Sequence, residues 1–130
     1  MARLIADTNL LISAERRGQT LENLVGQDDD LGIASVTAAE MLVGVELASA
    51  RHREPRRAYV EGMLQELTIE DYTLDVARAH AVLMAHVRRT GRPRGVVDLI
   101  IAATAVARDR TVITADRSAF EELPGVEIRP

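Results

Sequence analysis

The chain contains no cysteine and no lysine, and aromatic residues make up only 2% of its 130 residues. The lack of cysteine excludes disulfides and zinc sites built from thiolates. With so few aromatic residues the core must consist of Ala, Val, Leu and Ile, which suits helices packed closely on a sheet. The apolar share of 47% is ordinary for a globular protein, and the length predicts one domain, residues 1–130.

Long apolar runs are also missing. No run approaches the roughly 20 apolar residues that a membrane-spanning helix needs. The N-terminus has no basic start followed by an apolar segment of signal-peptide type, because Asp7 interrupts the run directly after Ala6. We therefore expect a cytoplasmic protein with no membrane segment.

Short apolar segments alternate with segments of helical periodicity along the chain. Strands are expected at 2–6, 31–34, 67–69 and 110–114, with a further candidate at 126–128. Helices are expected at 8–17, 35–50, 56–66, 74–89 and 96–108, with shorter helical segments at 20–26 and 116–123 and a break at 52–55. Short strands that are apolar on both faces predict an α/β fold: a three-layer α/β/α sandwich around a short central, mainly parallel sheet.

Four acidic residues occur where no acid is needed to build the local element. Asp7 and Asp116 each follow an apolar strand, Glu40 lies early in a helix, and Asp98 lies within an apolar helix. The carboxyl ends of parallel strands meet at one edge of a sheet, so two separate strands deliver an acid to the same rim. Carboxylates gathered at the edge of a core repel each other and need a cation, of which Mg²⁺ or Mn²⁺ suits an all-oxygen site.

Each acid taken alone also has a structural explanation. Asp7 and Asp116 are good N-cap residues for the helical segments that follow them. Glu40 completes a capping-box pattern with Thr37. These alternatives leave open whether the three residues cap helices, bind metal or do both.

Asp98 is the acid that a structural role explains least well. A mid-helix Asp has poor helix propensity, and its flanks are apolar. An ion pair with Arg94, one turn earlier, is the plain alternative. The small side chains of Ala102 and Ala105 share the helix face of Asp98 and are expected to leave room beside it for a ligand.

Other chemistries lack their motifs. The chain has no glycine-rich phosphate loop and no G-x-S-x-G nucleophile motif. A Mg-binding, noncatalytic signalling module of receiver type would need a lysine late in the chain, and a phosphatase with an aspartate nucleophile would need an acid where Asn9 stands. A purely structural protein with four capping acids is a further alternative.

Four segments together resemble one known family. Residues 5–9 (IADTN), 37–40 (TAAE), 98–105 (DLIIAATA) and 114–120 (TADRSAF) occur in the order and at about the separations of the acid motifs of PIN-domain ribonucleases. The chain more narrowly resembles the VapC-type toxins of bacterial toxin–antitoxin pairs. The resemblance covers essentially the whole chain.

The resemblance implies a PIN-like fold and a metal-dependent endoribonuclease that hydrolyses RNA phosphodiester bonds with Mg²⁺ or Mn²⁺. It implies three partners: RNA (tRNA, rRNA or mRNA), a cognate VapB-type antitoxin, and a second copy of the chain in a homodimer. The alternative within the same family is a PIN-type RNA-processing nuclease outside a toxin–antitoxin system.

The resemblance also assigns roles to residues. The catalytic metal ligands, direct or through water, are expected to be Asp7, Glu40, Asp98 and Asp116. A supporting or substrate-contacting role is expected for Thr8, Asn9, Thr114 and Arg117. RNA phosphates are expected to meet Arg88, Arg89, Arg92 and Arg94, because arginine binds phosphate with a two-pronged fork. The alternative for these arginines is a solvated charged surface.

Overall fold

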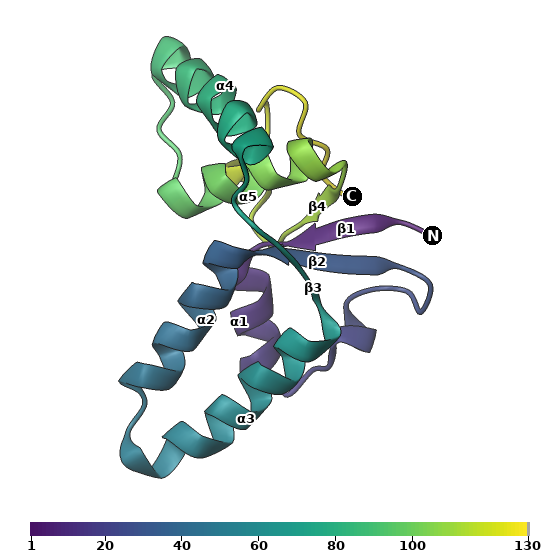
Figure 1. The fold of residues 1–130 in the computed structure, drawn as a ribbon, viewed down its shortest axis with the longest axis vertical. Helices are drawn as coiled ribbons and strands as arrows, with labels where there is room; N and C mark the ends of the chain where they lie inside the picture. The colour runs from purple at the N-terminus through teal and green to yellow at the C-terminus, as the bar shows by residue number, and fades with distance from the viewer. Residues whose placement is uncertain (130) are drawn as a thin grey trace.

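The computed structural model describes residues 1–129, in which a sheet of four parallel strands separates two layers of helices (Figure 1). The strands are β1 (Arg3–Ala6), β2 (Asp30–Ala34), β3 (Thr68–Glu70) and β4 (Thr111–Ile113). They lie side by side in the order β3-β2-β1-β4. The predicted α/β fold with a short parallel sheet is therefore confirmed.

The helices cover both faces of this sheet. One layer holds α1 (Thr8–Arg16), α2 (Ser35–Leu47) and α3 (Ala50–Glu66), and the other holds α4 (Leu74–Thr90) and α5 (Val96–Arg108) (Figure 1). Two short 3-10 helices complete the elements: η1 (Leu21–Asn23) and η2 (Arg117–Ala119). None of the helices described between residues 1 and 129 is long and apolar enough to cross a membrane.

Alternating side chains of each strand fill two separate cores. Leu4 and Ala6 of β1 pack in the core shared with α1, α2 and α3. Ile5, between them, packs in the other core with α4 and α5. This alternation is the consequence of the two-residue period of a strand, and it explains why the strands are apolar on both faces.

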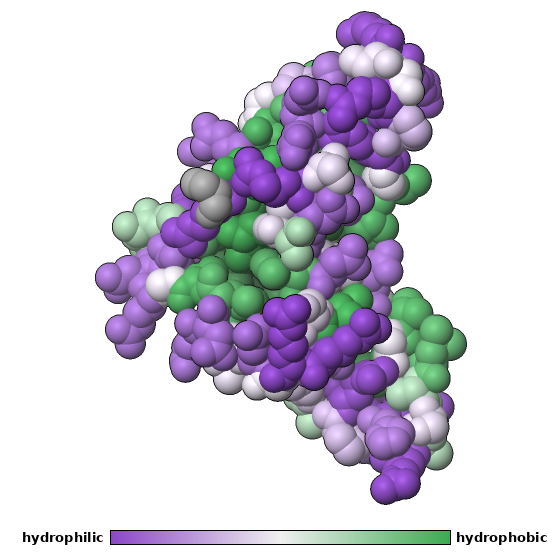
Figure 2. Space-filling view, turned by 180° about the vertical axis from the view of Figure 1, so that it is seen from behind, coloured by the Kyte–Doolittle hydropathy of each residue, from purple (hydrophilic) through white to green (hydrophobic). Residues whose placement is uncertain are grey.

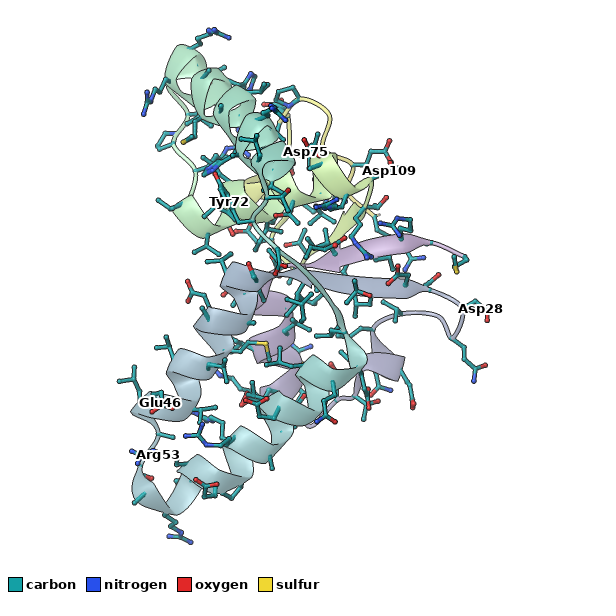
Figure 3. All side chains as sticks on the ribbon, in the orientation of Figure 1. Asp28, Glu46, Arg53, Tyr72, Asp75 and Asp109 are labelled. Carbon is teal, nitrogen blue, oxygen red and sulfur yellow. The ribbon has the colours of Figure 1, made fainter. Side chains whose placement is uncertain are left out.

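The boundary between α2 and α3 differs from the prediction. The break expected at 52–55 is wrong: the chain leaves the helical conformation at Ala48 and Ser49, and Pro55 lies inside α3. The guanidinium of Arg53 donates to the Ala48 carbonyl at 2.9 Å and closes this turn. Arg53 and Glu46 mark the tip of the α2–α3 pair, far from the sheet (Figure 3). Proline inside a helix removes one backbone hydrogen bond, and here the remaining turns continue through it.

The segment 126–128 forms a single parallel bridge rather than a full strand. Ile128 pairs with Val112, whose N–H donates to the Glu127 carbonyl at 2.8 Å and whose carbonyl accepts from Arg129 at 2.9 Å. The C-terminal segment thus extends the sheet beyond β4 by one short contact.

The strand order creates a point where the direction of chain winding reverses. From β1 the chain adds β2 and β3 on one side, and then crosses the opposite face through α4 and α5 to add β4 on the other side of β1. Backbone pairing continues past the strands, because the Asp7 N–H donates to the Ile113 carbonyl at 3.2 Å. In open α/β sheets such a reversal leaves a crevice at the carboxyl ends of the two diverging strands.

The molecular surface follows this layered construction. Seen from the side opposite to Figure 1, apolar surface lies in the hollow between the two helical layers, and polar side chains dominate both ends of the molecule (Figure 2). A largely polar exterior of this kind is expected around two apolar cores.

Candidate active site

Asp7 follows β1 and begins α1, and both of its carboxylate oxygens have a donor. It is only 2% exposed. Its Oδ1 accepts the Leu10 N–H at 2.8 Å, which makes Asp7 the N-cap of α1. Its Oδ2 accepts the hydroxyl of Thr114. The capping role expected for Asp7 is therefore present, and it fixes the carboxylate at the edge of the core without using up all of its lone pairs.

Thr114 connects Asp7 to the segment that carries Asp116. Its hydroxyl donates to Asp7 and accepts the Asp116 N–H at 2.9 Å. The carboxylate of Asp116 in turn caps η2, since its Oδ1 accepts the N–H of Ser118 at 3.2 Å. Asp116 is exposed, so its carboxylate is open to a ligand from solvent.

Asp98 lies in the first turn of α5 and is half-buried. The helix begins at Val96, so the expectation of a mid-helix acid is wrong; an acid in the first turn interacts favourably with the helix dipole. Burial raises the pKa of Asp98 above its usual value, and the negative charges of Asp7 and Asp116 raise this pKa further. These shared electrostatic effects show that the fold brings the three aspartates near one another.

Two other expectations about the surroundings of Asp98 also fail. Arg94 does not pair with Asp98 in the described part of the chain, because its guanidinium donates to the carbonyls of Ala119 and Glu121. Ala102 and Ala105 are at most 1% exposed and belong to the core, so their small size lets α5 approach the sheet and leaves no space for a ligand.

Glu40 lies apart from this group. It is exposed on α2 and is not among the charges that shift the pKa of Asp98. It lines a hollow of about 140 Å³ between α1, α2 and α3, whose wall also contains Glu15, Arg16 and Arg56. The capping box expected for Glu40 is absent, because α2 begins earlier, after Ala34, and has no side-chain cap.

The other residues predicted to support the site or contact the substrate, Thr8, Asn9 and Arg117, differ in burial and in hydrogen bonding. The Thr8 hydroxyl is buried and donates to Thr37 at 3.1 Å, so it joins the starts of α1 and α2 rather than touching an acid. Asn9 is exposed in the first turn of α1. Arg117 is exposed next to Asp116 and donates to the Arg129 carbonyl at 3.3 Å.

Of the four arginines expected to bind RNA phosphate near Asp98, only some are free of contacts within residues 1–129. Arg92 pairs with Glu122. Arg88 and Arg89 are exposed in the last turn of α4, where their charge also favours the helix terminus. Two arginines of the predicted four are thus engaged within the protein.

Sequence reasoning missed Gly95, the N-cap residue directly before α5. A Cβ atom added to it would lie 2.9 Å from Oδ2 of Asp98, well inside normal contact distance. The Asp98 carboxylate therefore folds back over the start of its own helix, in space that only glycine leaves open. The available signal was a glycine three residues before an otherwise unexplained acid.

The donor set fits a divalent cation of the Mg²⁺ type. Asp7, Asp98 and Asp116 offer oxygen ligands only. The raised pKa of Asp98 reflects first its burial and then repulsion by Asp7 and Asp116, which a cation would relieve. Within residues 1–129 no three His, Asp or Glu side chains are already gathered closely enough to hold a metal ion. Binding of a cation by Asp7, Asp98 and Asp116 would therefore draw their carboxylates closer together, with water and phosphate completing its coordination.

Comparison with known proteins gives consistent matches over nearly the full chain. The model of the PIN domain family matches residues 4–126. A ribonuclease VapC5 of Mycobacterium tuberculosis is 35% identical over 129 residues, covering 95% of this chain and 92% of the relative. A tRNA(fMet)-specific endonuclease VapC of Salmonella typhimurium is 34% identical over 96 residues, covering 74% of this chain and 71% of the relative.

A solved structure agrees with these sequence matches. The DNA-bound VapBC of Salmonella typhimurium superposes with a TM-score of 0.88 at 29% identity, over 99% of this chain and 98% of the other. The similarity therefore extends to the order of the strands and to the layers of helices that carry the acids.

Proposed function

The chain belongs to the PIN-domain family, within its VapC ribonucleases, and we propose that it cleaves RNA with divalent metal ions held by its clustered aspartates. The family predicted from the four acid motifs is confirmed. The reaction that the site supports best is hydrolysis of a phosphodiester bond within an RNA strand.

One observation supports the proposed chemistry: Asp7 follows β1, Asp116 follows β4, and the charges of both act on Asp98 in the first turn of α5. Burial and the two neighbouring charges raise the pKa of Asp98, so a bound cation would stabilise its ionised form. Oxygen ligands alone favour Mg²⁺ or Mn²⁺ over softer metals. Such an ion supplies a bound water of lowered pKa and neutralises charge on the phosphate.

The chain's own residues would hold and orient this ion. The Leu10 N–H and the Thr114 hydroxyl fix the two oxygens of Asp7, which limits the directions in which its remaining lone pairs point. Thr114 also holds the backbone at Asp116, so one hydroxyl sets the relation between two ligands. Outer contacts of this kind orient metal ligands in other proteins.

Glu40 remains a proposed ligand that acts through water, because it lines a hollow next to α1 rather than the aspartate group. Thr8 supports the site indirectly by joining the helices that carry Asp7 and Glu40. We propose Asn9 and Arg117 as contacts to the RNA, because both are exposed beside an aspartate of the group.

The similar proteins suggest an RNA substrate and a protein partner for this chain. One similar protein is named as acting on a tRNA, so tRNA is the first RNA to test for this chain. The similar VapBC complex suggests a VapB-type antitoxin as partner. Val43 and Leu47, which are 51% and 81% exposed on α2, are apolar enough to be covered by a protein, either an antitoxin or a second copy of the chain.

A cleavage assay tests the proposed activity. The purified chain is incubated with total RNA, and with tRNA alone, in Mg²⁺ or Mn²⁺ and in EDTA. Cleavage is expected with either metal and should stop in EDTA. Cleavage that survives EDTA would contradict the metal mechanism.

A pair of aspartate variants sharpens this test. Asp98→Asn should lower cleavage by about 10²-fold or more, because it removes a ligand charge from the metal site. Asp75→Asn is the matched control, since Asp75 is also an acid in the first turn of a helix but is exposed and paired only with Arg78. Equal loss of activity in both variants would remove Asp98 from the active site.

A further inference from the structure

Arg94 joins two segments of the chain that each carry an aspartate of the site. Its Nη1 donates to the Ala119 carbonyl at 3.0 Å, and its Nη2 donates to the Glu121 carbonyl at 2.7 Å. The accepting carbonyls lie 25 and 27 residues further along the chain. One half-buried side chain therefore ties the loop before α5 to the segment after β4.

The geometry of this contact requires arginine. Two nitrogens of a planar guanidinium reach two separate carbonyls at once, which a single ammonium group on a flexible stem does not reproduce. Hydrogen bonds from a charged donor are stronger than bonds between neutral groups. The contact is thus a rigid brace between the two segments.

On one side, the brace lies directly before α5, the helix that carries Asp98 in its first turn. Arg94 directly precedes Gly95, the N-cap residue of α5, and a Cβ at Gly95 would lie 2.9 Å from Oδ2 of Asp98. The backbone at residues 94 and 95 therefore lies against the Asp98 carboxylate.

On the other side, the brace ends just beyond Asp116. The Ala119 carbonyl belongs to η2, the short helix that Asp116 caps through Ser118. Fixing η2 therefore also fixes the direction of the Asp116 carboxylate. The same guanidinium acts on two aspartates without touching either of them.

We propose that Arg94 is a positioning residue that sets the spacing between Asp98 and Asp116 and so preorganises the metal site. This inference rests on the proposed function, because it concerns the same aspartates. It replaces the expectation that Arg94 binds RNA phosphate: both of its Nη atoms are held by backbone carbonyls, so its loss should weaken metal binding and leave RNA affinity unchanged.

Arg92 provides a matched control in the same loop. It also reaches the segment after η2, where it pairs with Glu122, but both side chains of this pair are more than half exposed, at 55% and 69%. Exposed ion pairs contribute little to stability, because water screens the two charges. Arg92→Ala removes the same charge from the same loop and keeps the brace.

The experiment measures Mn²⁺ affinity by electron paramagnetic resonance in the absence of RNA. Arg94→Ala should raise the Mn²⁺ dissociation constant about 10- to 100-fold, the usual range for residues that support metal ligands. Arg92→Ala should change it less than about twofold. The variants' thermal unfolding is followed in parallel, and if Arg94→Ala does not fold, Arg94→Lys serves instead and should also weaken Mn²⁺ binding.

RNA measurements separate positioning from substrate binding. In Arg94→Ala, kcat should fall, while KM for RNA at saturating Mn²⁺ stays within about twofold of the wild-type value. Added guanidinium ion should partly restore Mn²⁺ binding to the same variant. Unchanged Mn²⁺ affinity would overturn the proposal, as would a raised KM with normal Mn²⁺ binding, which would indicate an RNA contact. Failure of the proposed function has a separate sign. In that case the wild-type protein itself would not cleave RNA, regardless of how tightly Arg94→Ala binds Mn²⁺.

Discussion

At the scale of single residues, the aspartates of the site combine a structural and a chemical role. Asp7 and Asp116 each cap a helix with one oxygen, and Asp7 also accepts the Thr114 hydroxyl. The capping and metal-binding interpretations, which compete when the sequence is considered alone, are therefore compatible in space. A carboxylate fixed by a cap is also preorganised for a ligand, because its orientation no longer varies.

Asp98 should destabilise the metal-free protein at neutral pH. Its pKa in the folded state lies above its usual value, so the folded protein holds a proton that the unfolded chain has already released. The stability contributed by this group therefore falls as the pH rises from the ordinary pKa of Asp through the raised pKa, and the loss is complete above the raised pKa.

Asp98→Asn should therefore unfold at a higher temperature than the wild type at pH 7 in EDTA. The difference should shrink toward zero as the pH falls below the usual pKa of Asp, because the wild-type carboxyl group is then neutral as well. Thermal unfolding across this pH range measures it. A variant that is less stable than the wild type at pH 7 would show that Asp98 stabilises the fold.

At the scale of elements, α5 is the part of the fold whose position matters most for the site. Ala102, Ala103 and Ala105 are buried, the first two fully inaccessible, so the helix backbone comes close to the sheet. This contact places the first turn, with Asp98, beside the carboxyl ends of β1 and β4. The sequence indicated a buried helix here but not the purpose of its small residues.

Ala102→Leu should destabilise the protein by about 1–3 kcal/mol, because the core has no room for three extra carbon atoms beside the sheet. Urea unfolding measures the change. Val106→Leu is the control, since Val106 is 38% exposed on the same helix and its enlargement should alter stability by less than about 0.5 kcal/mol. Equal stability of Ala102→Leu and the wild type would mean that α5 can move away from the sheet without cost.

The elements also show where local patterns mislead. The sequence predicts a break between helices at 52–55, yet α3 continues through Pro55. Ser49 is extended at φ −61° and ψ 157° and already separates the two helices. A proline weakens a helix locally, but the packing of the whole helix on α2 decides whether it continues.

At the scale of the whole molecule, a buried arginine at the opposite end of the sheet ties the strands together. The side chain of Arg110 is 1% exposed and donates to the Leu4 and Asp30 carbonyls at 3.0 and 3.1 Å. It also pairs with the carboxylate of Glu70 at 2.8 Å. Gly32 allows this path, because a Cβ there would lie 2.9 Å from Cζ of Arg110.

Arg110→Met should lower the free energy of unfolding by about 3–5 kcal/mol, since it removes the buried partner of Glu70 and leaves this largely buried charge with the more distant Arg3 at 3.9 Å. Urea unfolding measures this loss. Arg78→Met is the control: its pair with Asp75 is more than two-thirds exposed on both sides and should contribute about 0.5 kcal/mol or less. Similar losses in the two variants would show that burial adds nothing to the Arg110 network.

The sequence by itself determined the local features of this protein. The alternation of short apolar strands with helices predicted the α/β fold, and the four acids in their flanking motifs predicted the family. These features depend on side-chain periodicity and on residue order, which the chain displays directly.

Only the tertiary structure decided how these parts meet. The strand order, the grouping of Asp98 with Asp7 and Asp116, the separate position of Glu40 and the engagement of Arg94 all depend on contacts between distant segments. Such contacts arise from the burial of apolar surface and the pairing of polar groups in three dimensions, for which local periodicity carries no information.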